Sequence, residues 1–167
     1  MDKTEVATVL KSEVYDNGNC PTGFTYNANL YVDDYACQNF GSTIQIFNKV
    51  AYCYTILAIP DILSTMVTIV NQDGCNTLYD ASVNNLKIGS ALEMDWIFAT
   101  FGAVSAGGYR VSDTKFLNYD NTTFNAYGKT IQDKTNTFIV FTSDGQLTTS
   151  NSISYLLCRY RAMTVGC

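Results

Sequence analysis

The C-terminal stretch TFIVFTSDGQLTTSNSISYLLCRYRA, residues 137–162, carries the strongest structural signal in the chain. Residues 137–142 are β-branched or aromatic, and such residues are enriched in strands. Ser143-Asp144-Gly145 follows as a turn signal, and residues 153–162 form a further strand-like run around Cys158. The stretch therefore predicts two strands of a sheet.

Two more strands are predicted towards the middle of the chain. Ile44 and Ile46 alternate with polar neighbours, and residues 51–57 are apolar and aromatic. Asn48-Lys49 lies between the two runs and predicts a turn.

Two helices are predicted after these strands. Pro60 suits the first turn of a helix, because its missing N–H costs nothing there, and Gly74 is the expected end. A second helix is predicted over residues 82–98, with Ser82 as its cap and Gly102 beyond its end. The buried faces are expected to consist of Leu63, Met66, Val67 and Val70 in the first helix, and of Ile88, Ala91, Leu92, Trp96 and Ala99 in the second.

A long loop region is predicted over residues 102–136. Gly107-Gly108 is expected to open it, and residues 115–119 and 124–127 predict short strands on either side of the turn at Asp120-Asn121. The order of elements predicts an α+β fold with its helices clustered in one part of the chain. Residues 1–42 are expected to form a loop-rich extension, residues 43–162 the domain, and residues 163–167 a tail.

Composition narrows the class of protein. A chain of 167 residues suits one domain, and 47% apolar residues support a packed core. The net charge is −5 and Lys and Arg form no run, which argues against a nucleic-acid partner. No stretch approaches the roughly 20 apolar residues that span a bilayer, so we expect no membrane insertion.

The six cysteines indicate the compartment. Their even number and wide spacing suit three disulfides. Zinc is the alternative, but its sites use close cysteine pairs, often with His, and the chain has neither. Residues 1–5 contain no signal core, so either a signal was removed or the protein stays in the cell; disulfides favour a secreted or extracellular protein. The sequon Asn121-Thr122-Thr123 predicts glycosylation at Asn121.

Several of these features together resemble a C-type lectin-like domain in a divergent long form. Cys53-Tyr54 is similar to the family's first strand, two helices follow, Cys75 lies near the end of the first, and Cys158 lies in the last strand. Residues 138–147 resemble the strand and Asp-Gly turn of the family, and residues 116–121 resemble the segment that usually carries Trp-x-Asp-Gly. The resemblance covers about residues 37–162.

The resemblance implies disulfide pairings. Cys75 would pair with Cys158, and Cys37 with Cys53 would close an N-terminal hairpin. Cys20 and Cys167 lie outside the shared region and are expected to pair with each other. The chain departs from the family in lacking the second core disulfide. Its Trp-Ile-Gly-Leu strand is matched only by Trp96-Ile97 or by residues 107–110.

The resemblance does not extend to the family's calcium site. Sugar-binding members use a proline-containing tripeptide and Trp-Asn-Asp, whereas this chain has only Pro21 and Pro60 and no Trp-Asn-Asp. We therefore expect no metal and no cofactor. The remaining oxygen donors of the loop region are expected to serve in turns: Asp113, Asn118, Asp120, Asn121 and Asp144.

Catalytic chemistry is also not indicated. The absence of His excludes Ser-His-Asp and Cys-His arrangements. Paired carboxylates are the remaining option for hydrolysis. The available acidic residues are better explained by capping and solvation: Asp33, Asp34, Asp73 and Asp80. We expect a protein that is not an enzyme.

Tyrosines in the loop region are the candidate contact residues. Tyr109, Asn118, Tyr119 and Tyr127 are predicted to bind a protein or glycan partner without calcium, because tyrosine offers a large, stiff contact area. Packing against the sheet is the alternative role, and Tyr26, Tyr31 and Tyr35 form a second candidate group. The predicted function is a secreted recognition module. The alternatives are a structural subunit of an extracellular coat, fibre or adhesin, and a secreted carboxylate-based hydrolase.

Overall fold

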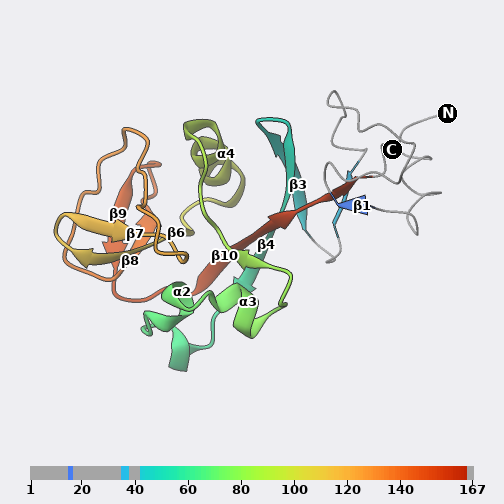
Figure 1. The fold of residues 1–167 in the computed structure, drawn as a ribbon. Helices are drawn as coiled ribbons and strands as arrows, with labels where there is room; N and C mark the ends of the chain where they lie inside the picture. Colours follow the sequence, from blue (N-terminus) through green and yellow to red (C-terminus); the bar gives the residue numbers. More distant parts are fainter. Residues whose placement is uncertain (1–14, 17–34, 38–41, 165–167) are drawn as a thin grey trace. The chain divides into compact units, whose positions relative to one another are not determined.

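The computed structural model describes residues 15–16, 35–37 and 42–164 (Figure 1). It is an α+β structure with antiparallel sheets and few, mostly short helices, so the predicted class is confirmed. The chain divides into two compact units, residues 1–55 with 160–167 and residues 56–159. The predictions for Cys20, Pro21, Tyr26, Tyr31, Asp33, Asp34 and Cys167 lie outside the described residues.

The first unit contains a tight hairpin and a small sheet. β3 (Thr43–Phe47) pairs with β4 (Val50–Ala58), and Asn48 and Lys49 both have positive φ, at 51° and 65°. Two such residues in succession are typical of the type I′ turn of a two-residue hairpin, so the predicted turn is confirmed. The small sheet has the order β1-β11-β2, with β1 at Tyr15–Asp16, β2 at Tyr35–Ala36 and β11 at Met163–Thr164. A Cys37–Cys53 disulfide joins β4 to the residue after β2.

In the second unit, the predicted first helix is replaced by three short pieces. They are η3 (Asp61–Leu63), α2 (Thr68–Asn71) and α3 (Gly74–Leu78). Gly74 begins α3 instead of ending a helix, and Asp73 before it is left-handed, with φ 51°. A Cβ on Gly74 would lie 2.5 Å from the carbonyl oxygen of Ile69, so only glycine allows this close approach.

The second predicted helix is real but starts later. α4 spans Ala91–Phe101, and its cap is Ser90, whose hydroxyl accepts a 3.1 Å bond from Glu93 N. The Glu93 carboxylate accepts a 2.7 Å bond from Gly89 N, one residue before the cap, so the pair resembles a capping box whose reciprocal bond is shifted by one residue. The predicted cap at Ser82 is therefore wrong. Gly102 ends the helix at φ 75°, as predicted.

The predicted buried face of the second helix is correct for Ile88, which is buried just before α4, and wrong for the residues within α4. Leu92 is 75% exposed, while Glu93, Met94 and Ile97 are the buried residues. Apolar side chains occur all around this helix, so their spacing does not single out one face. Glu93 can be buried because Arg159 pairs with it, at 2.9 Å.

Gly107 and Gly108 lie inside a strand and do not open a loop. They belong to β6 (Ser105–Ser112), in a sheet of order β7-β6-β8-β9. A Cβ on Gly107 would meet the Leu86 carbonyl oxygen at 2.2 Å, and one on Gly108 would meet the Phe124 ring at 2.6 Å. The glycines thus allow neighbouring residues to pack directly on the strand. The other strands are β7 (Lys115–Leu117), β8 (Phe138–Phe141) and β9 (Leu147–Ser150).

The last long strand, β10 (Tyr155–Arg161), pairs with β4 and with β5 (Asn84–Asn85) and is joined to α3 by a disulfide. It confirms the strand predicted over residues 153–162 and lies in a sheet of order β3-β4-β10-β5. A Cys75–Cys158 disulfide ties α3 to β10. The predicted strand over residues 124–127 is wrong, since only Thr123 forms an isolated bridge, to Leu117. The largest fully buried side chains of this unit include Leu86, Met94, Ile97, Phe138, Ile139, Leu147, Leu156 and Leu157.

Candidate functional site

Residues 118–129, here called the recognition segment, contain no helix or strand, yet their backbone is tied down. Asn118 N donates to Thr122 O at 2.8 Å, and Asn121 N donates to Asn118 O at 3.0 Å. Phe124 N then donates to Phe116 O at 2.9 Å, and the Phe124 ring is buried over Gly108. An irregular segment with such bonds keeps a defined shape.

Asn118 holds the turn from inside. Its side chain is buried, with 4% of the residue exposed, and its amide donates to Thr122 Oγ1 and to Thr123 O, both at 3.2 Å. A partner would therefore not touch this amide without unfolding the turn. Asn118 is better described as a positioning residue than as a contact residue.

Tyr109, like Asn118, is buried and supports the turn from inside. It lies in β6, only 7% exposed, and its hydroxyl donates to Asn121 Oδ1 at 3.3 Å. Asn121 is exposed and left-handed, with φ 66°, a conformation that asparagine tolerates better than most residues. Tyr109 thus supports the exposed tip that also carries the predicted glycosylation sequon.

Tyr119 and Asp120 lie at the exposed side of the turn, next to Lys87. Lys87 Nζ donates to Asp120 Oδ2 at 2.8 Å. Burial opposes ionisation of Asp120, but hydrogen bonds from Lys87 and Thr122 outweigh it and lower its pKa to about 2. Burial raises the pKa of Tyr119, and the carboxylates of Asp73 and Asp120 add to the effect. The Tyr119 phenol therefore stays neutral at physiological pH, next to the Lys87–Asp120 pair.

Tyr127 anchors the other end of the segment. Its hydroxyl donates to Ile88 O at 3.3 Å, and a turn through Tyr127 (φ 49°) and Gly128 (φ 82°) is closed by Lys129 N donating to Ala126 O at 3.0 Å. Lys129 then pairs with Asp95 of α4 at 3.3 Å. A small polar hollow of about 230 Å³ is lined by Tyr127, Gly128, Lys129 and Asp95, together with Ala91, Met94 and Gln146.

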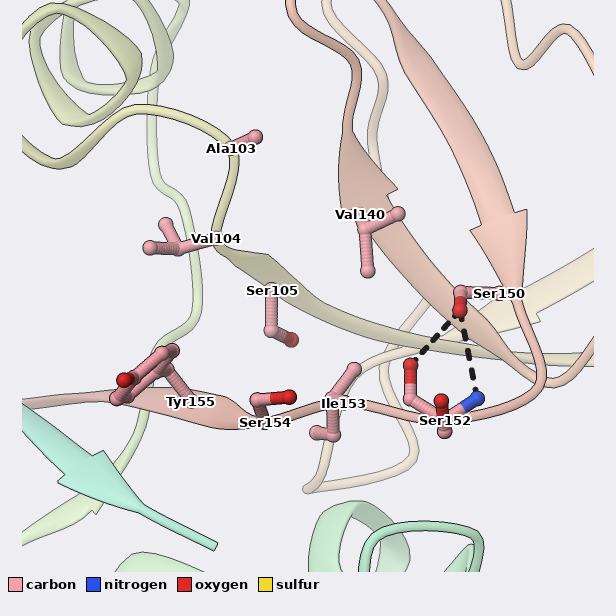
Figure 2. A pocket seen from close by; sticks show the side chains of 9 residues that line it. All are labelled: Ala103, Val104, Ser105, Val140, Ser150, Ser152, Ile153, Ser154 and Tyr155. Carbon is pink, nitrogen blue, oxygen red and sulfur yellow. Dashed lines mark hydrogen bonds between the residues drawn. The ribbon is translucent and has the colours of Figure 1, made fainter.

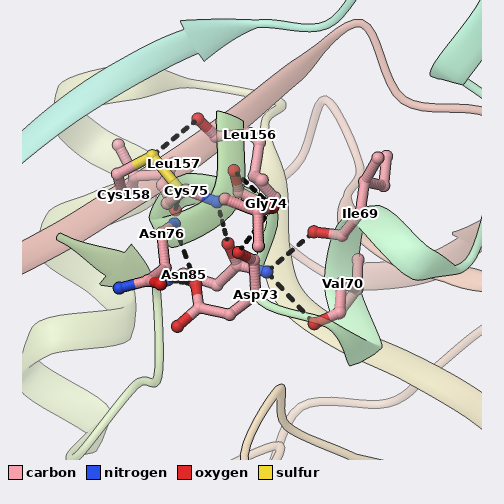
Figure 3. The surroundings of a disulfide bond; sticks show 11 residues. Ile69, Val70, Asp73, Gly74, Cys75, Asn76, Asn85, Leu156, Leu157 and Cys158 are labelled. Atoms are coloured by element: carbon pink, nitrogen blue, oxygen red, sulfur yellow. Dashed lines mark hydrogen bonds between the residues drawn. A yellow bond between two sulfur atoms is a disulfide. The ribbon is translucent and has the colours of Figure 1, made fainter. Parts of the chain in front are cut away.

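The side chain of Asn85 joins the end of α2 to the start of α3, next to the Cys75–Cys158 disulfide, as Figure 3 shows. Its Nδ2 donates to Ile69 O at 2.9 Å and to Val70 O at 3.2 Å, which satisfies the end of α2. Its Oδ1 accepts from Cys75 N at 2.8 Å, at the start of α3. The residue is 1% exposed. This single amide explains why the expected continuous helix is broken here.

The acidic residues are occupied in turns and caps. Asp73 accepts from Asn85 N at 2.7 Å and caps α3 through Asn76 N at 3.4 Å, while burial raises its pKa. Ser82 N and its hydroxyl lower the pKa of Asp80. Asp144 bonds to the Thr142 hydroxyl, which lowers its pKa, and Asp113 pairs with Arg110. Within the described ranges, no three His, Cys, Asp or Glu side chains form a group that could hold a metal ion.

Comparison with known proteins leaves the family open. No protein-family model matches the chain, and no curated protein matches it. In the part of the chain that the structure describes, no helix has the length and apolar character needed to cross a membrane. All four cysteines of that part are in disulfides, which are typical of an oxidising environment.

Proposed function

We propose that the chain is a non-catalytic recognition domain of the extracellular space, which binds a protein or glycan partner through the recognition segment without calcium. The observation that carries the proposal is the fixed, irregular shape of residues 118–129. Asn118 and Tyr109 hold the segment from below, and Tyr127 fixes its end. Binding residues are often found on loops that a stiff scaffold positions in this way.

A segment that is already ordered before binding loses less conformational entropy when a partner binds. The entropy of ordering a mobile loop opposes association, and a loop that is already ordered avoids this cost. Tyr119 and Tyr127 add partly exposed aromatic area with few rotatable bonds. The paired charges Lys87–Asp120 and Lys129–Asp95 present both signs, which suits a polar partner better than a polyanion.

We further propose that the fold is a divergent form of the C-type lectin-like fold. The hairpin with Cys53, the helical pieces, α4, the sheet and the final strand follow one another in the order that the resemblance implies. The Cys75–Cys158 disulfide, between the first helical region and the last strand, agrees with the same pattern. The three-part first helix and the lack of a second core disulfide would be the divergent features.

The proposal is tested by binding of the labelled protein to arrays of secreted proteins, cell-surface proteins and glycans, in buffer with a calcium chelator. We expect at least one ligand whose signal falls about tenfold or more in a Tyr119→Ala/Tyr127→Ala double variant. Tyr79→Ala, which removes an exposed tyrosine of the α3 end, is the matched control and should bind like the wild type. Equal binding by the double variant and the wild type would refute the assignment to this segment, and so would no bound ligand on any array.

A further inference from the structure

The sequon at Asn121 lies at the exposed tip of the turn that opens the recognition segment, and the sequence contains no other N-x-S/T pattern. Asn121 and Thr123, the two residues that the pattern requires, are both exposed. An N-linked glycan is bulky and hydrophilic, so its asparagine has to be open to solvent in the folded protein. The position of Asn121 meets this condition.

The side chain of Asn121 is held by its oxygen, while its nitrogen stays unused. The Tyr109 hydroxyl donates to Asn121 Oδ1 at 3.3 Å. Among the hydrogen bonds of the described residues, none involves Asn121 Nδ2, the atom to which an N-linked sugar is attached. The first sugar would therefore leave the turn in the direction that Tyr109 sets.

The bonds that close the turn are made by other atoms. Asn118 N donates to Thr122 O at 2.8 Å, and the backbone N of Asn121 donates to Asn118 O at 3.0 Å. The Asn118 side-chain amide donates to Thr122 Oγ1 and Thr123 O, both at 3.2 Å. The turn can thus form all of these bonds with a glycan already attached to Nδ2.

Tyr119, Asp120 and Lys87, here called the Tyr119 end, lie next to the root of such a glycan. Tyr119 and Asp120 come just before Asn121 in the chain, and Lys87 Nζ donates to Asp120 Oδ2 at 2.8 Å. A glycan covers the surface beside its root because it is larger than any side chain. A macromolecular partner would therefore be kept from the Tyr119 end.

Tyr127, Gly128 and Lys129, here called the Tyr127 end, are held by other parts of the fold. The Tyr127 hydroxyl donates to Ile88 O at 3.3 Å, and Lys129 pairs with Asp95 of α4 at 3.3 Å. The polar hollow of about 230 Å³ lies here, and its lining includes no residue of the sequon or of the Tyr119 end. This end offers a partner both an aromatic side chain and a concave polar surface.

We propose that Asn121 carries an N-linked glycan that shields the Tyr119 end, so that a partner binds the recognition segment at its Tyr127 end. The choice of end rests on the proposed function, whereas the glycan and its shielding do not. In the attachment step, Nδ2 gives up a proton and bonds to the anomeric carbon of an oligosaccharide. The bond from that carbon to the diphosphate of a lipid carrier breaks, and the secreting cell supplies this lipid-linked donor.

The first test is the mass of the full chain, secreted from cultured animal cells behind a cleavable signal sequence, before and after peptide-N-glycosidase treatment. We expect the mass of one glycan in the wild type and in Thr123→Ser, and its loss in Asn121→Gln and in Thr123→Ala, which keeps the Asn121 side chain. Asn151→Gln, which changes an exposed asparagine outside any sequon, is the matched control and should keep the glycan. A wild type secreted without a glycan would overturn the proposal.

The second test measures shielding and needs no partner. Oxidation of Tyr119 by hydroxyl radicals, read by peptide mass spectrometry, should be at least about twofold faster in Thr123→Ala than in the glycosylated wild type. Tyr155 is the internal reference, because it is 54% exposed and lines a hollow that shares no residue with the recognition segment (Figure 2). Its oxidation should not change. Equal oxidation of Tyr119 in the two proteins would overturn the shielding.

The third test identifies the end that binds. With a ligand from the arrays, Tyr127→Ala should weaken binding of the glycosylated protein about tenfold, and Tyr119→Ala by less than about twofold. Equal losses in the two variants would contradict the choice of end. The mass and oxidation tests decide on the glycan and its shielding whether or not the arrays yield a ligand, so failure of the proposed function is distinguishable from failure of this inference.

Discussion

Replacing Asn85 by alanine should cost this protein a large part of its stability. The change removes the bond to Cys75 N at 2.8 Å and the bond to Ile69 O at 2.9 Å, and both groups lie in the interior. Val70 O loses a bond too, but it still accepts from Asp73 N at 3.2 Å. An unsatisfied buried polar group costs about 1–3 kcal/mol, so the two groups together predict a loss of about 2–6 kcal/mol.

This loss is large against the total of about 5–15 kcal/mol expected for a small domain. Urea denaturation, with the disulfides intact, measures it as a lower midpoint at constant slope. Asn84→Ala is the matched control, because it changes the same residue type one position earlier in β5, where the side chain is half-buried; its loss should stay below about 1 kcal/mol. Hydrogen exchange at Cys75 N should be faster in Asn85→Ala than in Asn84→Ala, which would show that the loss of stability comes from the missing bond to this amide.

Asn85→Asp refines the same prediction. The introduced carboxylate keeps the acceptor for Cys75 N but directs an oxygen at two carbonyls, so at neutral pH it should destabilise at least as much as alanine. Its pKa would be raised in the folded state, and stability should therefore recover as the pH falls and the carboxyl gains a proton to donate. If Asn85→Ala loses no more stability than Asn84→Ala, the role assigned to this amide is refuted.

Three further predictions concern other parts of the second unit. Gly107→Ala should lower the free energy of unfolding by more than about 3 kcal/mol, because the added Cβ would lie 2.2 Å from Leu86 O at a backbone φ of 88°. Gly128→Ala has a similar φ, 82°, but open space around the Cβ, so its loss should be only about 1 kcal/mol. Urea denaturation of the two variants compares these losses. Glu93→Ala should lower the free energy of unfolding by about 3–5 kcal/mol in the same assay, since it removes the carboxylate that pairs with the largely buried Arg159 at 2.9 Å. Glu93→Gln should lose less, because the introduced amide oxygen can still accept from Gly89 N. Asp120 has a folded-state pKa of about 2, below its unfolded value of about 4, so its stabilising effect is present above pH 4 and lost as the pH falls towards 2. The stability difference between wild type and Asp120→Asn, less than about 1 kcal/mol for such an exposed pair, should accordingly shrink over that range, and a constant difference would argue against the Lys87 pairing.

Local signals in the sequence predicted local structure well. The alternation at Ile44 and Ile46 and the turn at Asn48-Lys49 gave the β3–β4 hairpin. Gly102 ended α4 as expected, and β8 and its turn followed from the β-branched and aromatic residues before Ser143. These features depend on neighbours in the chain, which a sequence displays directly.

Other features depend on contacts between distant residues. The break between α2 and α3 follows from the Asn85 amide, and the strand at Gly107-Gly108 follows from Leu86 and Phe124 packing on it. Neither contact has a sequence signal. The start of α4 does have one, because Ser90 and Glu93 form the S-x-x-E pattern of a capping box, which is a stronger signal than the lone Ser82.

The candidate site was predictable only in outline. The sequence predicted a loop region over residues 102–136, but β6 and β7 occupy part of it, and composition does not distinguish a buried tyrosine from an exposed one. Tyr109 and Asn118 became supports because β6 and the turn bury them. The partners Lys87 and Asp95 come from outside the segment, at positions that its own sequence does not indicate.

The most direct test of the account is the mobility of the recognition segment in the unbound protein. Backbone ¹⁵N relaxation gives an order parameter for each amide, and a stiff backbone has a value of about 0.85. We predict values near this level for Thr122, Phe124 and Lys129, whose amides all donate hydrogen bonds, similar to those of β6 and β8. Values below about 0.6 across residues 118–129 would contradict the claim that this segment is a preformed recognition surface.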